Sequence, residues 1–200
     1  MQVQNNIFVS LDEFEKMQKD NDCKVEYNNG EVLLSSNSSR KHNKIIRKIL
    51  QGIGSFFNHS KCDYYNEQIE IILKNDTQIY KYKPDIFIIC DNFEEEGESI
   101  VGVPKIIFEV VSENYEHYDY FIKLRIYEKF GVAEYNIVNQ YGSIIQYILK
   151  EDKYIVNKCF HKDEIYESSI FPELKIELAN VFEWTKNKSH FINVTYIRYK

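Results

Sequence analysis

Two carboxylates in apolar surroundings are the first residues of this sequence that could do chemistry. Asp85 follows Lys83-Pro84 at the start of one apolar run, and Glu109 lies inside the next, residues 106–111. An ionised carboxylate inside such a run is costly unless it is paired or binds a cation. If the two runs are neighbouring strands, both carboxylates and the carbonyl of Val110 supply the hard oxygen ligands that Mg²⁺ prefers. The alternative is that Asp85 is a turn or cap residue after proline.

A lysine follows these carboxylates on a segment with helical spacing. Asp119, Lys123 and Tyr127 recur at intervals of four residues and so share one face of a helix. Lys123 could reach the carboxylates from there, to stabilise developing negative charge or to orient an attacking water. We expect it beside a solvated cleft, where it contributes little to folding. The alternative is an exposed ion pair between Lys123 and Asp119.

An earlier helix, expected from residue 39 to about residue 58, carries one histidine among its apolar residues. His42 shares a face with Ile45, Ile49 and Ile53 and should therefore point inward, either as a hydrogen-bonded core residue or toward the carboxylates. The opposite face is basic, and we name three of its residues as candidate nucleic-acid contacts: Arg40, Lys44 and Arg47. A plain solvated face is the alternative for this stripe.

The first residues predict a short helix and a hairpin. Ser10 and Glu13 have the spacing of a capping box before an amphipathic helix. Asn29-Gly30 then separates two strand-like runs, residues 24–27 and 31–34, as a two-residue turn with positive φ requires.

The remainder alternates strands and helices. Apolar runs predict strands at residues 64–73, 86–90 and 106–111, with an acidic loop at residues 91–99. A helix over residues 115–130 should end at Gly131. Three more strands are expected at residues 134–138, 143–149 and 154–158. This order indicates an α/β (α+β) domain with a mixed central sheet, helices on its faces and an N-terminal β-hairpin.

Length and composition fit one domain. The chain has 200 residues, of which 44% are hydrophobic, enough for a single core. We assign residues 1–184 to the domain and residues 185–200 to an extension, either an edge strand or a frayed tail. The net charge of -6 excludes a generally basic nucleic-acid binder, so any such site must be local. Without an apolar span or a signal peptide, we expect a cytoplasmic protein with no membrane partner.

The four cysteines predict neither a zinc site nor a disulfide framework. Cys23, Cys62, Cys90 and Cys159 are scattered along the chain with no CxxC pair. We expect reduced and mostly buried thiols.

In order and spacing these elements together resemble the Uma-two family of restriction-endonuclease-like PD-(D/E)xK nucleases. The resemblance covers about residues 8–183. It is carried by Glu26 with Gly30-Glu31, Ser39-Arg40-Lys41-His42, Pro84-Asp85, Glu109-Val110-Val111-Ser112, Asp119 with Lys123 and Tyr127, and Gly131-Val132-Ala133-Glu134-Tyr135.

The resemblance implies a restriction-endonuclease-like fold and a metal-dependent endonuclease. Asp85 and Glu109 would bind Mg²⁺ (or Mn²⁺), and Lys123 would replace the lysine that most PD-(D/E)xK enzymes carry where Val111 stands. Glu31 would be an auxiliary carboxylate, with Glu26 as its competitor. The implied substrate is DNA, although the sequence leaves RNA open, and a homodimer is the commonest oligomer.

Two departures favour an alternative, a nuclease-fold module that binds or regulates without turnover. Relatives tend to carry a proline and a basic residue after the position of Ser112, whereas this chain has Glu113-Asn114-Tyr115. Asn136 also stands where a tryptophan is usual.

Overall fold

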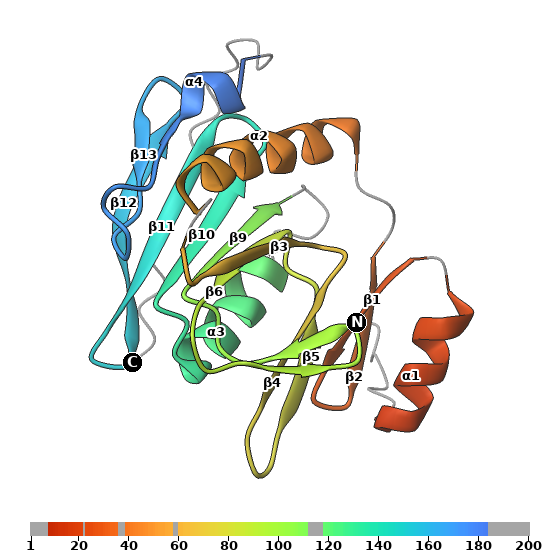
Figure 1. Cartoon of the computed structure of the whole chain (residues 1–200). Coiled ribbons are helices and arrows are strands. Elements are labelled where there is room, and N and C mark those ends of the chain that lie inside the picture. Colours follow the sequence, from red (N-terminus) through yellow and green to blue (C-terminus); the bar gives the residue numbers. More distant parts are fainter. Residues whose placement is uncertain (1–7, 22, 36–38, 58–59, 112–117, 184–200) are drawn as a thin grey trace, which may run out of the picture.

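The computed structural model (Figure 1) describes residues 8–21, 23–35, 39–57, 60–111 and 118–183. Its strands form two six-stranded mixed sheets and a two-stranded ribbon. The first sheet contains, in spatial order, β2 (Glu31–Ser35), β1 (Lys24–Asn28), β5 (Ile79–Tyr82), β4 (Glu70–Lys74), β8 (Ser99–Val101) and β7 (Glu94–Glu96). The second contains β12 (Lys153–His161), β11 (Ser143–Lys150), β10 (Glu134–Asn139), β9 (Ile106–Val111), β6 (Ile86–Ile89) and β3 (Asp63–Asn66).

The remaining elements are the ribbon and the helices. The ribbon pairs β13 (Ile165–Glu167) with β14 (Lys175–Glu177). The helices are α1 (Leu11–Asp20), α2 (Arg40–Phe57), a π-helical segment η1 (Tyr118–Lys123) that continues as α3 (Leu124–Phe130), and α4 (Leu178–Val181). No helix among the described residues is long and apolar enough to cross a membrane.

The N-terminal helix and hairpin form as predicted. The Ser10 hydroxyl accepts from the Glu13 amide at 3.4 Å, and the Glu13 carboxylate accepts from the Ser10 amide at 2.9 Å, which completes the capping box. Asn29 and Gly30 have φ values of 47° and 107°, the left-handed conformation that a two-residue turn between twisted strands requires. Strand β1 pairs with β2 on one side and with β5 on the other, so the hairpin is part of the first sheet.

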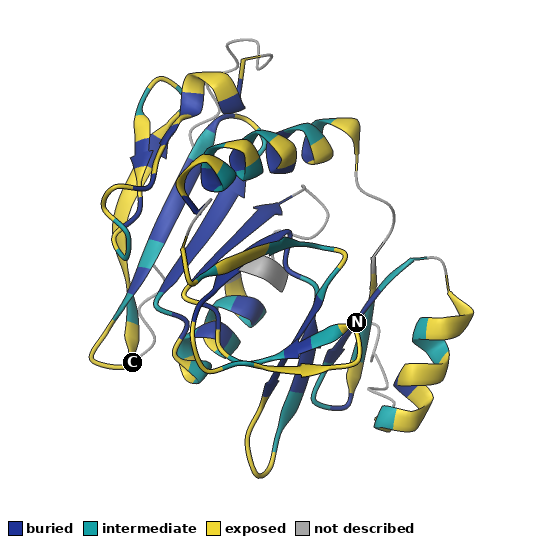
Figure 2. Ribbon diagram, in the orientation of Figure 1, coloured by how far each residue is buried: buried dark blue, intermediate teal, exposed yellow. Residues whose placement is uncertain are grey.

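The second sheet lies between α2 on one face and α3 with part of the first sheet on the other. Alternate residues of β9 face opposite ways: Phe108 and Val110 pack against α2, whereas Ile107 and Val111 pack with Tyr127 of α3 and strands of the first sheet. Figure 2 shows β9 and β10 buried over their whole length. Strands covered on both faces explain the nearly continuous apolar runs in the sequence.

The run predicted as one strand over residues 64–73 is two strands in different sheets. β3 ends at Asn66, whose side-chain oxygen accepts from the Gln68 amide at 3.2 Å and whose carbonyl accepts from the Ile69 amide at 3.1 Å. This turn redirects the chain, and β4 begins at Glu70 in the other sheet. The prediction of an uninterrupted strand was wrong, because an asparagine-centred turn outweighed the apolar alternation around it.

Two other predictions are corrected in part. The acidic loop over residues 91–99 contains the short strand β7, and residues 94–96 pair with β8. The helix predicted over residues 115–130 begins as η1, while residues 112–117 lie outside the described residues. Its predicted end is confirmed, because Gly131 has φ 84° and donates its amide to the carbonyl of Glu128. The extension predicted after residue 184 also lies outside the described residues.

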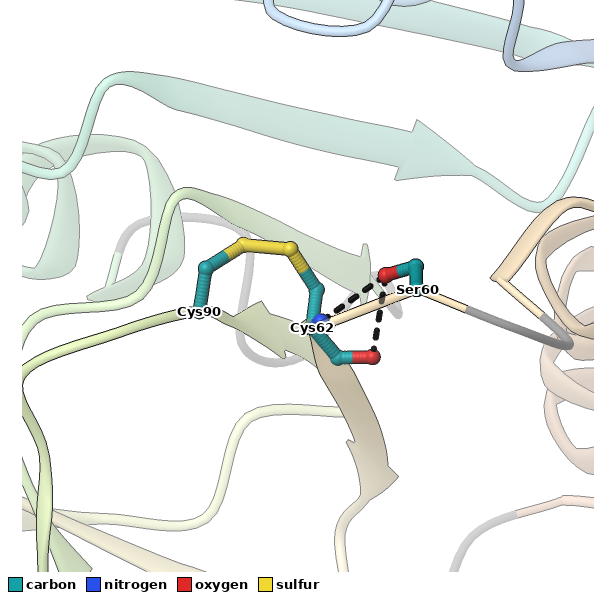
Figure 3. Close-up of a disulfide and its surroundings, with 3 residues drawn as sticks. All are labelled: Ser60, Cys62 and Cys90. Carbon is teal, nitrogen blue, oxygen red and sulfur yellow. Dashed lines mark hydrogen bonds between the residues drawn. A yellow bond between two sulfur atoms is a disulfide. The ribbon is translucent and has the colours of Figure 1, made fainter.

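A disulfide joins Cys62 to Cys90 (Figure 3), so the prediction of four reduced cysteines was wrong. Cys62 directly precedes β3 and Cys90 directly follows β6, and the pairing of Asp63 with Ile89 places the two cysteines opposite each other. The 28-residue separation of the two cysteines does not predict that they are close in space, because their proximity depends on strand register alone. Cys23 and Cys159 are free.

Glu134 attaches the C-terminal segment to the second sheet. This β10 residue is fully buried, and its carboxylate accepts from the Ser168 hydroxyl at 3.0 Å, from the Ser169 amide at 2.7 Å and from the Tyr166 hydroxyl. The Asn136 side-chain amide adds a further donor at 2.9 Å. These donors offset the cost of burying the charge, as hydrogen bonds to a buried carboxylate do.

Candidate metal centre

Asp85 lies at the centre of a group of buried charges. It directly precedes β6, is 4% exposed, and accepts with Oδ2 from the Val110 amide at 2.7 Å. Nε2 of His42 contacts the same oxygen at 2.9 Å. Burial alone would raise the pKa of Asp85, but the His42 hydrogen bond, the Lys24 ammonium and the Val110 amide together lower it to about 2. Asp85 therefore stays ionised.

His42 lies in the first turn of α2 and points inward, as its helical face predicts. It is buried, and of its two expected orientations the structure shows the one toward the carboxylates. Burial would lower the pKa of His42, but Asp85 outweighs that effect and raises it. Its Nδ1 is buried and has no hydrogen-bond partner among the described residues.

Glu67 is a member of this group that the sequence analysis missed. It lies in the turn between β3 and β4, next to the start of β6. Ligand atoms of His42, Glu67 and Asp85 all lie within 4.8 Å of one another. Burial and the neighbouring Asp85 charge raise the pKa of Glu67, and its Oε2 is buried without a hydrogen-bond partner among the described residues. An orphaned carboxylate oxygen beside a second carboxylate and an imidazole is the pattern expected of a cation site.

Glu109 joins the group from β9, the strand that pairs with β6. It is 2% exposed, and its Oε1 accepts from Nζ of Lys123 at 2.8 Å and from the Tyr127 hydroxyl at 3.1 Å. Burial raises the pKa of Glu109, the Lys123 ammonium opposes this rise, and the charge of Asp85 adds to it. The cost of this carboxylate inside an apolar strand is thus offset by two donors and one opposite charge.

Lys123 is not the solvent-facing residue that we expected. Its side chain is 2% exposed at the end of η1, and Nζ lies 3.2 Å from Oε1 of Glu26 as well as 2.8 Å from Glu109. The ammonium also lies over the ring of Tyr82, 5.5 Å from its centroid. This burial rules out a merely exposed pair with Asp119, whose own side chain lies outside the described part of the structure.

The hairpin contributes Glu26 and Lys24 from β1. Glu26 is 2% exposed and accepts from the Lys83 amide at 2.8 Å. Burial would raise its pKa, but Lys123 and Lys24 lower it overall. Nζ of Lys24 lies 3.6 Å from Glu26 and 3.9 Å from Oδ1 of Asp85, so it connects the hairpin to the second sheet. We name these eight residues the charged cluster: Lys24, Glu26, His42, Glu67, Asp85, Glu109, Lys123 and Tyr127.

Other predicted site residues occupy different places. Glu31 is exposed beside the hairpin turn and accepts from the Asn28 side-chain amide at 3.1 Å. Its competitor Glu26 is the hairpin carboxylate that contacts Lys123. Arg40 and Arg47 are exposed on α2, while Nζ of Lys44 lies 3.1 Å from a carboxylate oxygen of Glu183.

The Val110 carbonyl has an orientation compatible with the ligand role expected for it. In an extended strand the amide and carbonyl of one residue point to the same side. The Val110 amide donates to Asp85, so its carbonyl also points toward that side of β9.

The charged cluster has an excess of negative charge that an added cation would neutralise. Four carboxylates (Glu26, Glu67, Asp85 and Glu109) face two ammonium groups (Lys24 and Lys123) and one imidazole (His42). With every group except the imidazole charged, two negative charges remain when His42 is neutral and one when it is protonated. Oxygen-rich donors with excess negative charge suit Mg²⁺ or Mn²⁺ better than a soft metal ion.

Known structures place this fold in a recognisable class. A crystal structure of a putative nuclease of the DUF820 group from Anabaena variabilis superposes with a TM-score of 0.70, covering 89% of this chain and 99% of that one at 18% identity. At that identity the likeness establishes the fold, and the expected restriction-endonuclease-like α+β class is confirmed.

The chain belongs to the Uma2 family, described as "Putative restriction endonuclease", whose model matches residues 11–179. The expected family is thereby confirmed, and membership supports a nuclease-like function. The chain is also 27% identical over 104 residues to the uncharacterised protein slr1290 of Synechocystis sp.. That match covers 52% of this chain and 54% of the relative, so the two are compared over only about half their lengths.

Proposed function

We propose that this protein is a phosphodiesterase that cleaves DNA with the help of Mg²⁺ or Mn²⁺. The observation that carries the proposal is the approach of His42, Glu67 and Asp85 within 4.8 Å, with one oxygen of Glu67 left without a partner among the described residues. Membership in the Uma2 family supports the same reaction class.

The proposed ligands are oxygens of Asp85 and of residues close to it. Asp85 and Glu109, with the Val110 carbonyl, are those expected from the sequence, and Glu67 adds a third carboxylate. His42 holds Asp85 through Nε2 and so orients a ligand, as outer partners of metal-binding carboxylates do. A divalent cation at these oxygens would supply Lewis acidity, lowering the pKa of a bound water and polarising a phosphoryl oxygen.

The remaining members of the cluster would set its electrostatics. Lys123 opposes the rise in the pKa of Glu109 and places positive charge next to the ligands, where an attacked phosphate would become more negative. Glu26 holds the Lys123 ammonium from the hairpin side, and the Tyr127 hydroxyl holds Glu109. These contacts are already formed in the structure, so the reaction would require little reorganisation of the protein.

The proposed nucleic-acid contacts follow from the position of α2. This helix carries the buried His42 in its first turn and Arg40 and Arg47 on its exposed side, so a phosphate backbone held at the cluster could continue along it. Lys44 would have to exchange Glu183 for phosphate. A local basic surface of this kind is compatible with a net charge of -6.

Cleavage assays test the proposal directly. Single- and double-stranded DNA and RNA are incubated with wild type, Asp85→Asn and Glu109→Gln in Mg²⁺, in Mn²⁺ and in EDTA. We expect metal-dependent DNA cleavage by wild type and a loss of at least about a hundredfold in both variants. Glu70→Gln is the matched control, because Glu70 is also a buried carboxylate, bound to Gln18, Ser99 and Lys81 outside the cluster.

The alternative is a binding or regulatory module that kept the nuclease fold. Circular dichroism would first establish that each variant is folded. If folded wild type binds Mn²⁺ and cleaves none of the four substrates, the module becomes the better account. Cleavage of RNA but not DNA would support the proposed phosphodiesterase chemistry and show that the substrate is RNA.

A further inference from the structure

Lys24 is the more exposed of the two lysines in the charged cluster. Its side chain is 23% exposed, compared with 2% for Lys123. Asp85, Glu26 and Glu109 are each less than 5% exposed. Of the two lysines, Lys24 is therefore the more open to an anion that approaches from solvent.

The contacts of Lys24 are also longer than those of Lys123. Nζ of Lys24 lies 3.6 Å from Glu26 and 3.9 Å from Asp85, beyond hydrogen-bonding distance, whereas Lys123 makes contacts of 2.8 and 3.2 Å. Lys24 is thus held by the attraction of neighbouring charges. An ammonium on a four-carbon stem can turn toward a new anion without breaking a short hydrogen bond in this group.

We propose that Lys24 binds a non-bridging oxygen of the substrate phosphate at the solvent side of the metal centre. The inference rests on the proposed function and assigns to Lys24 a role distinct from that of Lys123. Lysine is a common phosphate-binding residue, acting as a point charge. Lys24 lies 3.9 Å from Asp85, so a phosphate bound to it would be held next to the proposed metal ligands. A cation shared among the carboxylates would weaken their hold on Lys24 and favour its turn toward the phosphate.

Salt-dependent DNA binding tests this role apart from catalysis. Binding of a fluorescein-labelled DNA duplex is measured by anisotropy in Ca²⁺, with gels to verify that the duplex stays intact, between about 50 and about 200 mM salt. Lys24→Gln should bind about tenfold more weakly, and the slope of log K against log salt should fall by about one unit. Lys24→Arg keeps the charge and should retain the wild-type slope.

The control is Lys153→Gln. Lys153 lies on β12 and pairs with Glu128, outside the charged cluster, so its loss should change neither affinity nor slope. Equal affinity and slope in wild type and folded Lys24→Gln would overturn the inference.

Metal binding provides an independent readout. Calorimetry with Mn²⁺ should show Lys24→Gln binding at least as tightly as wild type, because one positive charge beside the ligands has been removed. A clear loss of Mn²⁺ affinity would place Lys24 in support of the metal ligands and overturn its role toward phosphate.

The two proposals fail in distinguishable ways. If wild type binds DNA through Lys24 and never cleaves it, the phosphate role holds and the catalytic proposal fails. If wild type cleaves DNA and Lys24→Gln has an unchanged KM, the phosphate role fails alone. If wild type neither binds nor cleaves nucleic acid, both fail.

Discussion

Glu67 and Asp85 meet at one end of the ladder formed by β3 and β6. Glu67 directly follows Asn66, Asp85 directly precedes Ile86, and Asn66 is paired with Ile86. The two carboxylates are treated differently by their surroundings: the pKa of Glu67 is raised by burial and by Asp85, whereas that of Asp85 is lowered by His42, Lys24 and the Val110 amide. A cation between the two carboxylates would therefore stabilise the ionised form of Glu67 more than that of Asp85.

Removal of Glu67 should weaken divalent-metal binding. Calorimetric titration with Mn²⁺ should show a loss of about tenfold or more in Glu67→Gln and in Asp85→Asn, because each loses a ligand carboxylate. Mn²⁺ should raise the melting temperature of wild type by mass action and that of the two variants much less. Glu70→Gln should respond as wild type does. Wild-type affinity in Glu67→Gln would contradict the assignment of Glu67.

Lys123 should matter to the fold as well as to activity. Lys123→Met leaves Glu26 and Glu109 buried without their shared cation, so we expect a loss of about 3–5 kcal/mol in the free energy of unfolding. Urea denaturation of wild type, Lys123→Met, Glu109→Gln and the double variant measures this. The double variant should be less destabilised than the sum of its parts, because the uncharged amide introduced by Glu109→Gln no longer needs the ammonium. Strict additivity would show that the two residues are not coupled.

The contact between His42 and Asp85 should make the stability of metal-free protein depend on pH. The folded pKa of His42 is raised, so its contribution is full below the unfolded value of about 6.5 and is lost as pH rises through the folded pKa. The pKa of Asp85 is lowered from 3.8 to about 2, so its contribution is present above 3.8 and is lost as pH falls toward 2. The pair stabilises most between about pH 4 and about pH 6.5.

Unfolding of wild type and His42→Asn in EDTA checks this window. Their difference in free energy of unfolding should be largest near about pH 5 and should shrink toward about pH 9. Lys24 and Glu67 also face the pair, and both remain in the two proteins compared. A difference independent of pH would contradict the expected linkage.

Glu134 should be a purely structural carboxylate. Glu134→Gln replaces an acceptor oxygen with an amide facing the donors of Ser168 and Ser169, and should cost at least about 2 kcal/mol of stability. Thermal unfolding measures the loss, and Mn²⁺ affinity of the folded variant should equal that of wild type. A weakened affinity would show that this end of the sheet supports the metal centre.

Several residues of the charged cluster could be singled out from the sequence because unusual surroundings mark them. Glu109 is a charge within an apolar strand, Asp85 begins such a strand, and His42 lies on the apolar face of a helix. Each therefore requires a partner that the sequence does not show nearby. The hairpin and the three strands β10, β11 and β12 were predicted from the sequence, since turn chemistry and alternation agree there, whereas the short strands β13 and β14 were not.

What could not be predicted depends on tertiary neighbourhood. Glu67 stands in a polar turn and Lys24 at the start of a hairpin strand, both ordinary places for charged residues. Their importance arises only when two sheets bring them to Asp85. Sequence spacing also does not reveal strand register or tertiary packing. The disulfide of Cys62 and Cys90 depends on the first, and the burial of Lys123 depends on the second.

The charged cluster also joins the two sheets. Glu26 and Lys24 come from β1 of the first sheet, Glu109 comes from β9 of the second, and Glu67 occupies the corner where the chain passes from one to the other. Sliding of one sheet against the other would change the distances among these charges. A cation bound there would hold the two sheets in the one alignment that completes its coordination. It would thereby restrict their relative motion and make the molecule stiffer than the side chains alone make it.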